Sequence, residues 1–168
     1  MNTATLVECT QARHGAAILD VLNDAILHTT ALYEYEPRTP QSMDGWFATR
    51  HERGFPVLGL EDRDGVLLGF ATYGVFRAYA AFGRCVEHSV YIHPAHRGQG
   101  HGERLLRELL DRATAQQLHL MVGCLDAGNA ASIALHRKLG FEHAGTLREA
   151  GWKFGRWLDL AFYQRLLA

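Results

Sequence analysis

Hydrophobic residues recur at helical spacing in several stretches of the chain. The clearest stretch is Gln11–His28, whose apolar positions are Ala17, Ile18, Val21, Leu22, Ala25 and Ile26. This stripe predicts an amphipathic helix with one face toward a core, and Thr10 is a suitable N-terminal cap for it. We expect further helices at Ser42–Glu52, at Glu103–Gln116 and at Ala130–Lys138, the last of them ended by Gly140.

Shorter segments rich in β-branched and aromatic residues, with turn residues between them, predict strands. They lie at Ala4–Glu8, Pro56–Leu60, Val66–Phe76, Arg84–Ile92, Leu118–Cys124, Phe141–Arg148 and Trp157–Leu166. Asp64-Gly65 is a hairpin signal, and the last two segments predict a closing hairpin. Because strands and helices alternate between the hairpins, we expect an α/β protein with a central mixed, partly parallel sheet and helices on both faces.

A glycine-rich turn, Arg97-Gly98-Gln99-Gly100-His101-Gly102, lies between a predicted strand and a predicted helix. The free N–H groups of a first helical turn and the positive end of the helix dipole favour a phosphate or pyrophosphate at such a place. The turn lacks the Gly-Lys-Ser/Thr of a Walker loop and the third glycine of the dinucleotide-binding fingerprint. Taken alone, it is equally consistent with a purely structural turn.

Two motifs carry a resemblance to a known family. His93–Gly102, which reads HPAHRGQGHG, resembles the acetyl-CoA-binding motif of the GNAT superfamily of N-acetyltransferases. Asn129–Phe141, which reads NAASIALHRKLGF, resembles the second motif of that superfamily. Both motifs occur in the family's order, which makes the pair more specific than either motif alone. The resemblance covers nearly the whole chain and implies the GNAT fold, with a central sheet that splays apart in the middle.

The resemblance implies acetyl-CoA as co-substrate and assigns its contacts by position. The pyrophosphate would bind the backbone at Arg97, Gly98, Gln99, Gly100, His101, Gly102 and Glu103. The pantetheine arm would pair in β fashion with Val90, Tyr91 and Ile92, in a slot between the strands Val86–Ile92 and Leu118–Cys124. Asn129 and Ser132 would contact the arm from the second motif, although Asn129 is also a suitable helix cap.

Glu87 is the candidate general base. On a strand, Glu87, Ser89 and Tyr91 share one face, whereas the other face carries Val86, His88, Val90 and Ile92. A carboxylate within an apolar strand is costly to bury, so Glu87 is expected to face a polar cavity or a partner. An alkylammonium must lose a proton before it attacks a thioester, and we expect Glu87 to accept that proton, directly or through a water. A structural, salt-bridged carboxylate is the alternative.

His136 stands where many GNAT enzymes carry a tyrosine that protonates the leaving thiolate. With Glu87–Ile92, Tyr73–Arg77 and the tail Gly151–Leu160, this histidine resembles the phosphinothricin acetyltransferase branch, in which a glutamate and a histidine are the proposed acid–base pair. An unperturbed imidazole titrates near pH ~6.5, so either role suits it. A structural histidine on a helix face is the alternative.

That branch acetylates the α-amine of small amino-acid analogues: phosphinothricin, methionine sulfoximine and methionine sulfone. The resemblance implies direct transfer in a ternary complex. It also implies a substrate pocket built from Tyr33 of the Tyr33–Glu36 loop, Arg77, Ala78, Tyr79, Glu87, His88, Ser89 and Lys153. A substrate carboxylate and an oxygen-rich head call for a cation and several donors. The loop Phe76–Tyr79 lacks the second cation of some relatives, which leaves the preferred analogue open, and Arg77 is also consistent with a solvated surface residue.

Two other functions stay open. A GNAT enzyme for another amine, such as a protein N-terminus, a polyamine or an antibiotic, is disfavoured by Arg77, because polyamines and aminoglycosides favour an acidic pocket. A non-catalytic acyl-CoA sensor is disfavoured by the presence of both Glu87 and His136. An acyl-cysteine intermediate on Cys85 or Cys124 is not expected, because neither has an activating base next to it in the sequence.

Composition excludes further classes. With 168 residues, of which 48% are hydrophobic and 21% charged, we expect one domain over 1–168. The net charge of −1 gives no attraction to nucleic acid, and no apolar run is long enough to span a membrane. Absence of a secretion signal and an odd number of widely spaced cysteines predict a cytoplasmic protein. No metal is expected, because the one histidine cluster, around His93-x-x-His96, falls on separate elements.

The tail is unusually aromatic, with Trp152, Phe154, Trp157 and Phe162. We expect some of these side chains in the core. The resemblance implies that others form a homodimer contact near the partner's active site.

Overall fold

Strands and helices alternate along residues 4–167, which are those that the computed structural model describes. The elements are β1 (Thr5–Glu8), α1 (Gln11–His28), α2 (Ser42–Glu52), β2 (Val57–Glu61), β3 (Leu67–Val75), β4 (Cys85–Ile92), α3 (His101–Ala115), β5 (Leu120–Asp126), α4 (Ala130–Lys138), β6 (Glu142–Lys153) and β7 (Arg156–Leu166). Short 3-10 turns at Ala80–Phe82 and Pro94–His96 lie before and after β4. The predicted helices are confirmed, three of them at their predicted starts.

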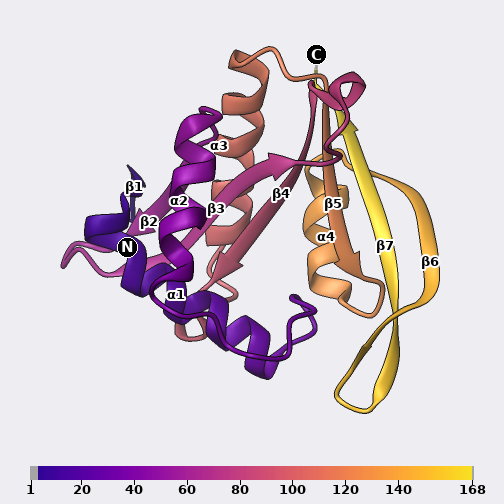
Figure 1. Ribbon diagram of the computed structural model, residues 1–168, viewed down its shortest axis with the longest axis horizontal. Coiled ribbons are helices and arrows are strands. Elements are labelled where there is room, and N and C mark those ends of the chain that lie inside the picture. Colours follow the sequence, from indigo (N-terminus) through magenta and orange to yellow (C-terminus); the bar gives the residue numbers. More distant parts are fainter. Residues whose placement is uncertain (1–3, 168) are drawn as a thin grey trace.

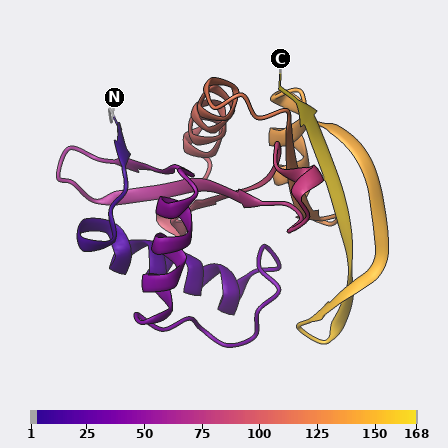
Figure 2. The same ribbon diagram turned by 45° about the horizontal axis from the view of Figure 1, so that its top comes forward.

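The strands form one sheet in the order β1-β2-β3-β4-β5-β7-β6, in which β4 and β5 are the parallel neighbours (Figure 1). Figure 2 shows α1 and α2 on one side of the sheet and α3 on the other. The expected mixed, partly parallel sheet with helices on both faces is therefore confirmed. Asp64-Gly65 lies in the β2–β3 hairpin, where Gly65 has a φ of +79°.

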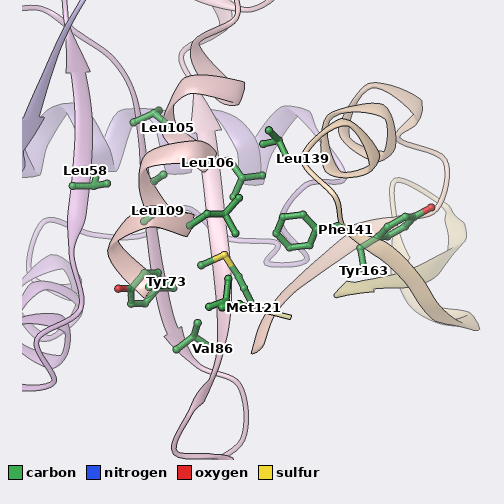
Figure 3. Packing of buried hydrophobic residues seen from close by; sticks show 14 of the residues in the cluster. Leu58, Tyr73, Val86, Leu105, Leu106, Leu109, Met121, Leu139, Phe141 and Tyr163 are labelled. Atoms are coloured by element: carbon green, nitrogen blue, oxygen red, sulfur yellow. The ribbon is translucent and has the colours of Figure 1, made fainter. Parts of the chain in front are cut away.

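Each face of the sheet has its own hydrophobic cluster. On the α3 face, Leu105, Leu106 and Leu109 pack with Met121 and Phe141 (Figure 3). On the α1–α2 face, the cluster includes Ile18, Leu22, Met43, Phe47 and Phe70. Burying a side chain of this size contributes about 1.5–3 kcal/mol. The two clusters hold the sheet in a fixed position between the helices.

The sheet opens between β4 and β5. The two strands pair only from Cys85 to Glu87 on β4 and from Leu120 to Val122 on β5. Beyond these residues both strands continue, and they diverge (Figure 1). The expected splay is confirmed, and it leaves a length of β4 with β3 as its only strand neighbour.

Hydrogen-bonded and non-bonded pairs alternate along an antiparallel ladder. The His93 N–H donates to the Leu68 carbonyl at 2.9 Å, so the main-chain groups of Val90 and Ile92, in the alternate register, face the opening. The Ile92 carbonyl accepts from Arg97 Nε at 3.2 Å. The Val90 main chain is thus in position to pair with an extended ligand.

The β6–β7 hairpin is long and extends beyond the rest of the sheet (Figure 1). Its turn consists of Phe154 and Gly155, with φ of +51° and +73°, which fits a two-residue turn of type I′. The β6 pairing shifts register between His143 and Gly145 and again between Leu147 and Gly151. Such irregularities bend a strand.

Candidate active site

The turn before α3 has the shape of an anion site. Gly98 and Gly100 have φ of +75° and +82°, and neither would meet another atom within 4 Å through an added Cβ. The start of α3 has no side-chain cap, and Arg104 is the first residue of the turn whose N–H reaches back to Gly100 O. The N–H groups of His101, Gly102 and Glu103 are therefore available for a phosphate. These residues fit a cofactor pyrophosphate.

The charged side chains of this turn are held at its edges. Glu103 forms ion pairs with Arg107 at 2.8 Å and Lys138 at 2.6 Å, so only its main-chain N–H remains for an anion. Arg97 bonds the Ile92 carbonyl and reaches Asp24 at 3.1 Å. The exposed Arg97–Asp24 pair is weak and leaves Arg97 able to turn toward a phosphate.

Glu87 is the last residue of β4 that pairs with β5, and it lies on the α1–α2 face. It is half-buried, and the residue opposite it on β3 is Gly74, whose missing side chain leaves open space. Burial raises the pKa of the Glu87 carboxyl, and a hydrogen bond from the Cys124 thiol partly opposes this rise. No ion pair to Glu87 occurs within residues 4–167. The carboxylate is thus free to accept a proton.

Cys124 lies beside Glu87 in the site, although the sequence indicates no role for it and no acyl-cysteine intermediate on it. Burial, with Glu87 beside it, raises the pKa of its thiol to about 12. The thiol therefore stays protonated and serves as a hydrogen-bond donor to the carboxylate. The alternating element order predicts that β4 and β5 are parallel neighbours. From that pairing, the proximity of Cys124 to Glu87 could have been predicted.

His88 and His136 form a buried pair on the opposite face of β4. Their Nε2 atoms are 2.9 Å apart, and His136 Nδ1 lies 2.7 Å from the Ser132 carbonyl. Because a carbonyl only accepts, His136 Nδ1 carries the hydrogen, and its Nε2 accepts from His88 Nε2–H. This assignment leaves His88 Nδ1 as a buried acceptor, the one buried side-chain N or O atom without a partner in the described residues.

The histidine pair is tightly enclosed. The rings stack with centroids 4.9 Å apart, and Phe141 packs edge-on against both. Gly123 of β5 makes room for them, since an added Cβ would lie 2.7 Å from His136 Nε2 and 2.9 Å from His88 Nε2. Burial lowers the pKa of His88 to about 3 and lowers the pKa of His136. Both imidazoles are therefore neutral at pH 7.

The two predicted acid–base residues are not in contact. Consecutive strand residues point to opposite faces, so Glu87 is on the α1–α2 face whereas His88 and His136 are on the α3–α4 face. All three lie where the pairing of β4 with β5 stops. Glu87 and His136 thus approach the opening from opposite sides of the sheet.

The structure revises two expected substrate contacts. His88 is buried against His136 and does not line an open pocket. The Lys153 ammonium is also buried and donates to the carbonyls of Ile26, Thr29 and Leu32 at 2.5–2.7 Å. These three bonds use all its N–H groups, so Lys153 caps the end of α1 and has no donor left for a substrate.

The other predicted residues surround the opening at different distances. Tyr33 packs near Gly151 and has Asp126 and Cys124 as neighbours, and mainly its burial raises its hydroxyl pKa. Ser89 interacts with the Tyr91 hydroxyl. Asn129 Oδ1 caps α4 by accepting from Ser132 N at 3.1 Å, which leaves its amide nitrogen for a ligand. The segment Arg77–Tyr79 is exposed in the β3–β4 connection.

Two negative observations hold for residues 4–167. No group of three or more His, Cys, Asp or Glu side chains there is arranged to hold a metal ion. None of the helices in this range is both long and apolar enough to cross a membrane.

A mixed sheet that opens beside a helix start with free N–H groups is the architecture of transferases that use an acyl-CoA donor. The chain belongs to the acetyltransferase (GNAT) family, whose model matches residues 20–141. It is thus an N-acetyltransferase, and the expected co-substrate of this family, acetyl-CoA, is confirmed.

Several relatives are close. An L-methionine sulfoximine/L-methionine sulfone acetyltransferase of Pseudomonas aeruginosa is 48% identical over 147 residues, covering 88% of this chain and 86% of that protein. A solved structure from Acinetobacter baylyi superimposes with a TM-score of 0.98 at 53% identity, covering 99% of this chain and 93% of the other. A phosphinothricin acetyltransferase of Sinorhizobium meliloti, solved with acetyl-CoA, gives a TM-score of 0.95 at 38% identity, with coverages of 99% and 89%.

Proposed function

We propose that this enzyme transfers the acetyl group of acetyl-CoA directly to the α-amine of a small amino-acid analogue, in a ternary complex. The substrate class is that of methionine sulfoximine, methionine sulfone and phosphinothricin, which the names of its relatives give for those proteins. The observation that carries the proposal is Glu87, a half-buried carboxylate that forms no ion pair within residues 4–167 and lies at the point where the sheet opens.

Glu87 is the general base in this proposal. Its raised pKa brings its basicity closer to that of an amine. Acetyl-CoA supplies the acetyl group as a thioester. Glu87 removes the ammonium proton from the α1–α2 face, and Tyr33 and Ser89 line the same side. His136 assists proton transfer from the other side of the opening, and this role requires the Nε2 bond to His88 to break, because Nδ1 already donates to the Ser132 carbonyl.

The first test is thiol release from acetyl-CoA with a panel of amines: methionine sulfone, methionine sulfoximine, phosphinothricin, spermidine and a peptide with a free N-terminus. Release that is fast only with the amino-acid analogues supports the proposal. Release with spermidine or the peptide alone assigns a different acceptor. No release with any amine, together with tight acetyl-CoA binding, supports a sensor and overturns the proposal.

Glu87→Gln tests the general base. The amide cannot accept the proton, and a positioned general base contributes about 10²–10⁴-fold to the rate. We expect kcat to fall by that order while acetyl-CoA affinity stays unchanged. In the unaltered enzyme, activity should decline as the pH falls through the raised pKa of Glu87, because the base is lost on protonation. The control is Glu52→Gln at the exposed end of α2; turnover of Glu87→Gln equal to this control would refute the assignment.

A homodimer and a cytoplasmic location complete the proposal. Trp152, Phe154 and Trp157 are each about half exposed at the hairpin end, at 47%, 57% and 56%, and exposed aromatic clusters favour association. The three cysteines are free thiols, as in proteins of reducing compartments.

A further inference from the structure

Arg50 of α2 is a cation without a counter-ion. It is partly buried, and no acidic side chain of residues 4–167 forms an ion pair with it. Burial, together with the neighbouring cation Arg38, lowers its pKa to about 10. The group is still charged at neutral pH. An anion that binds a partly desolvated cation next to a second cation gains a large electrostatic free energy.

Arg50 lies over the same face of the sheet as Glu87. Its Nε donates to the Thr72 hydroxyl at 3.0 Å. Thr72 is directly opposite Ser89 in the β3–β4 ladder, and Gly74 is opposite Glu87. Opposite residues of an antiparallel pair share a face, so Arg50 is held at Thr72, the diagonal neighbour of Glu87 across the β3–β4 ladder. Gly74 leaves open space beside Glu87 on this face.

The orientation of the guanidinium is set by α2. The Trp46 ring stacks on it at 3.7 Å, and Nη1 donates to the Trp46 carbonyl at 3.0 Å. These contacts use one face of the group, together with Nε and one N–H of Nη1. Nη2 has no hydrogen-bond partner within residues 4–167, and it is not among the fully buried unpartnered atoms there. The guanidinium of Arg50 therefore offers preorganised N–H donors to a carboxylate.

The charged groups around Arg50 are partly paired with one another. Arg38 is neutralised by Glu34, to which it donates through Nε and Nη2. Tyr91 contributes a hydroxyl near Arg38 and Glu87. Arg38 and Glu34 therefore offset each other, which leaves Arg50 and Glu87, within residues 4–167, as the two unpaired charged groups on this face, opposite in sign to the carboxylate and the ammonium group of an amino acid.

We propose that Arg50 binds the α-carboxylate of the substrate while Glu87 faces its amine, so that Arg50 selects amino acids over simple amines. Diagonal neighbours across an antiparallel pair, such as Thr72 and Glu87, are about 7–8 Å apart. An α-amino acid carries both groups on one carbon and adds a hydrogen bond of about 2.9 Å at each end, so it spans this separation. The inference rests on the proposed function and supplies the second cation that the Phe76–Tyr79 loop lacks.

The test compares two substrates that differ only in the carboxylate: methionine sulfone and methylsulfonylpropylamine, which is the same molecule without it. For Arg50→Gln we expect kcat/KM for methionine sulfone to fall about 10- to 100-fold, as for a lost charge-assisted bidentate contact. We expect kcat/KM for methylsulfonylpropylamine to change less than about threefold, because no carboxylate is present to lose its partner. An equal loss with both substrates, or no loss with either, overturns the inference.

Controls separate this result from misfolding and from failure of the proposed function. Arg53→Gln, at the exposed end of the same helix, should leave kcat/KM unchanged for both substrates. Arg50→Lys keeps the positive charge but loses the two parallel N–H donors of the guanidinium, and we expect it to recover part of the preference for methionine sulfone. If Arg50→Gln does not fold, Arg50→Lys takes its place in the test. A wild-type enzyme that turns over neither substrate overturns the proposed function itself, whereas one that turns over both equally overturns only the role of Arg50.

Discussion

Gly123 shows how one missing side chain determines a site. The His88–His136 pair occupies the volume where its Cβ would be, with both Nε2 atoms inside 3 Å of that position. For Gly123→Ala we expect a loss of about 1–3 kcal/mol in unfolding free energy, because Phe141 and α4 leave the rings little room to move. Activity should fall together with the stability, because the added methyl group forces the His88 and His136 rings apart.

Denaturant titration and kcat measurements on Gly123→Ala check this expectation. Gly45→Ala is the matched control, since its Cβ meets nothing within 4 Å on α2, and alanine should stabilise that helix by up to about 1 kcal/mol. If Gly123→Ala were as stable as the unaltered protein, the close packing of the pair would be disproved.

The buried histidines predict acid sensitivity. His88 has a folded-state pKa of about 3 against 6.5 for a free imidazole, so the unfolded chain takes up the proton first. Stability is then full above pH 6.5 and is lost as the pH falls from 6.5 toward 3. From pH 7 to pH 5 this one group costs about 2 kcal/mol by linkage, and His136, whose pKa is also lowered, acts in the same direction.

Urea titrations at pH 7 and pH 5 measure this loss. His88→Gln keeps an N–H donor for His136 but does not titrate, so we expect its stability to fall by about 2 kcal/mol less between the two pH values than that of the unaltered protein. An identical fall in both proteins would show that His88 is not held neutral by burial.

Sequence patterns predicted which face of β4 each residue occupies, but not the partners there. Alternation placed Glu87 and His88 on opposite faces, and the clusters confirm it, since Val90 and Ile92 pack toward α3 and Tyr91 toward α1. The pairing of His88 with His136 joins residues 48 apart. It depends on the position of α4 against β5, which no local pattern specifies.

Among the elements, the end of α1 depends on a residue far along the chain. Lys153, on the β6–β7 hairpin, bonds three carbonyls at and after this helix end. For Lys153→Met we expect a loss of about 2–4 kcal/mol, because the carbonyls lose a charged donor and one or more remain buried. At temperatures where the variant is folded, KM for the amino-acid substrate should change little.

Thermal unfolding and substrate titration test Lys153→Met, with Lys138→Met on the exposed end of α4 as the control. These are the only two lysines in the chain. An amine-reactive label should therefore modify Lys138 readily in the folded protein and Lys153 hardly at all. A large rise in KM without loss of stability would return Lys153 to the substrate pocket.

Caps and breakers explain which elements the sequence predicts well. Thr10 and Asn129 accept hydrogen bonds at the starts of α1 and α4, and both helices have their predicted bounds. The strand expected to end at Arg148 continues as β6 to Lys153. Its register shifts around Gly145 and Gly151 interrupt the alternation that marks a strand, so its length was hidden.

At the scale of the whole molecule, the hairpin end is the expected dimer contact. Trp152 and Trp157 pack edge to face at 5.0 Å and remain half exposed. Phe154→Asn with Trp157→Ser should yield a monomer, because the aromatic surface is lost while asparagine suits the positive φ of the turn. Light scattering at working concentration measures the mass; a monomeric mass for the unaltered protein would refute the dimer.

The sequence predicts the architecture better than the shape of the site. Element order and the two motifs led to the mixed sheet and the position of its opening. Arg50 was missed because its α2 segment carries no motif, and its relation to Glu87 arises only through the ladder of β3 with β4. Composition and periodicity do not predict contacts between segments that are distant in the chain.

The opening between β4 and β5 has a consequence for protection from solvent. Amide protons in a complete sheet exchange slowly with deuterium, whereas the Val90 amide faces a gap and should exchange fast. An extended ligand that pairs there acts as a substitute strand, and the ladder becomes continuous from β1 to β6. If acetyl-CoA fills the gap, deuterium uptake at the Val90 amide should slow when acetyl-CoA is added. This measurement detects binding in the gap even when no amine is present to react.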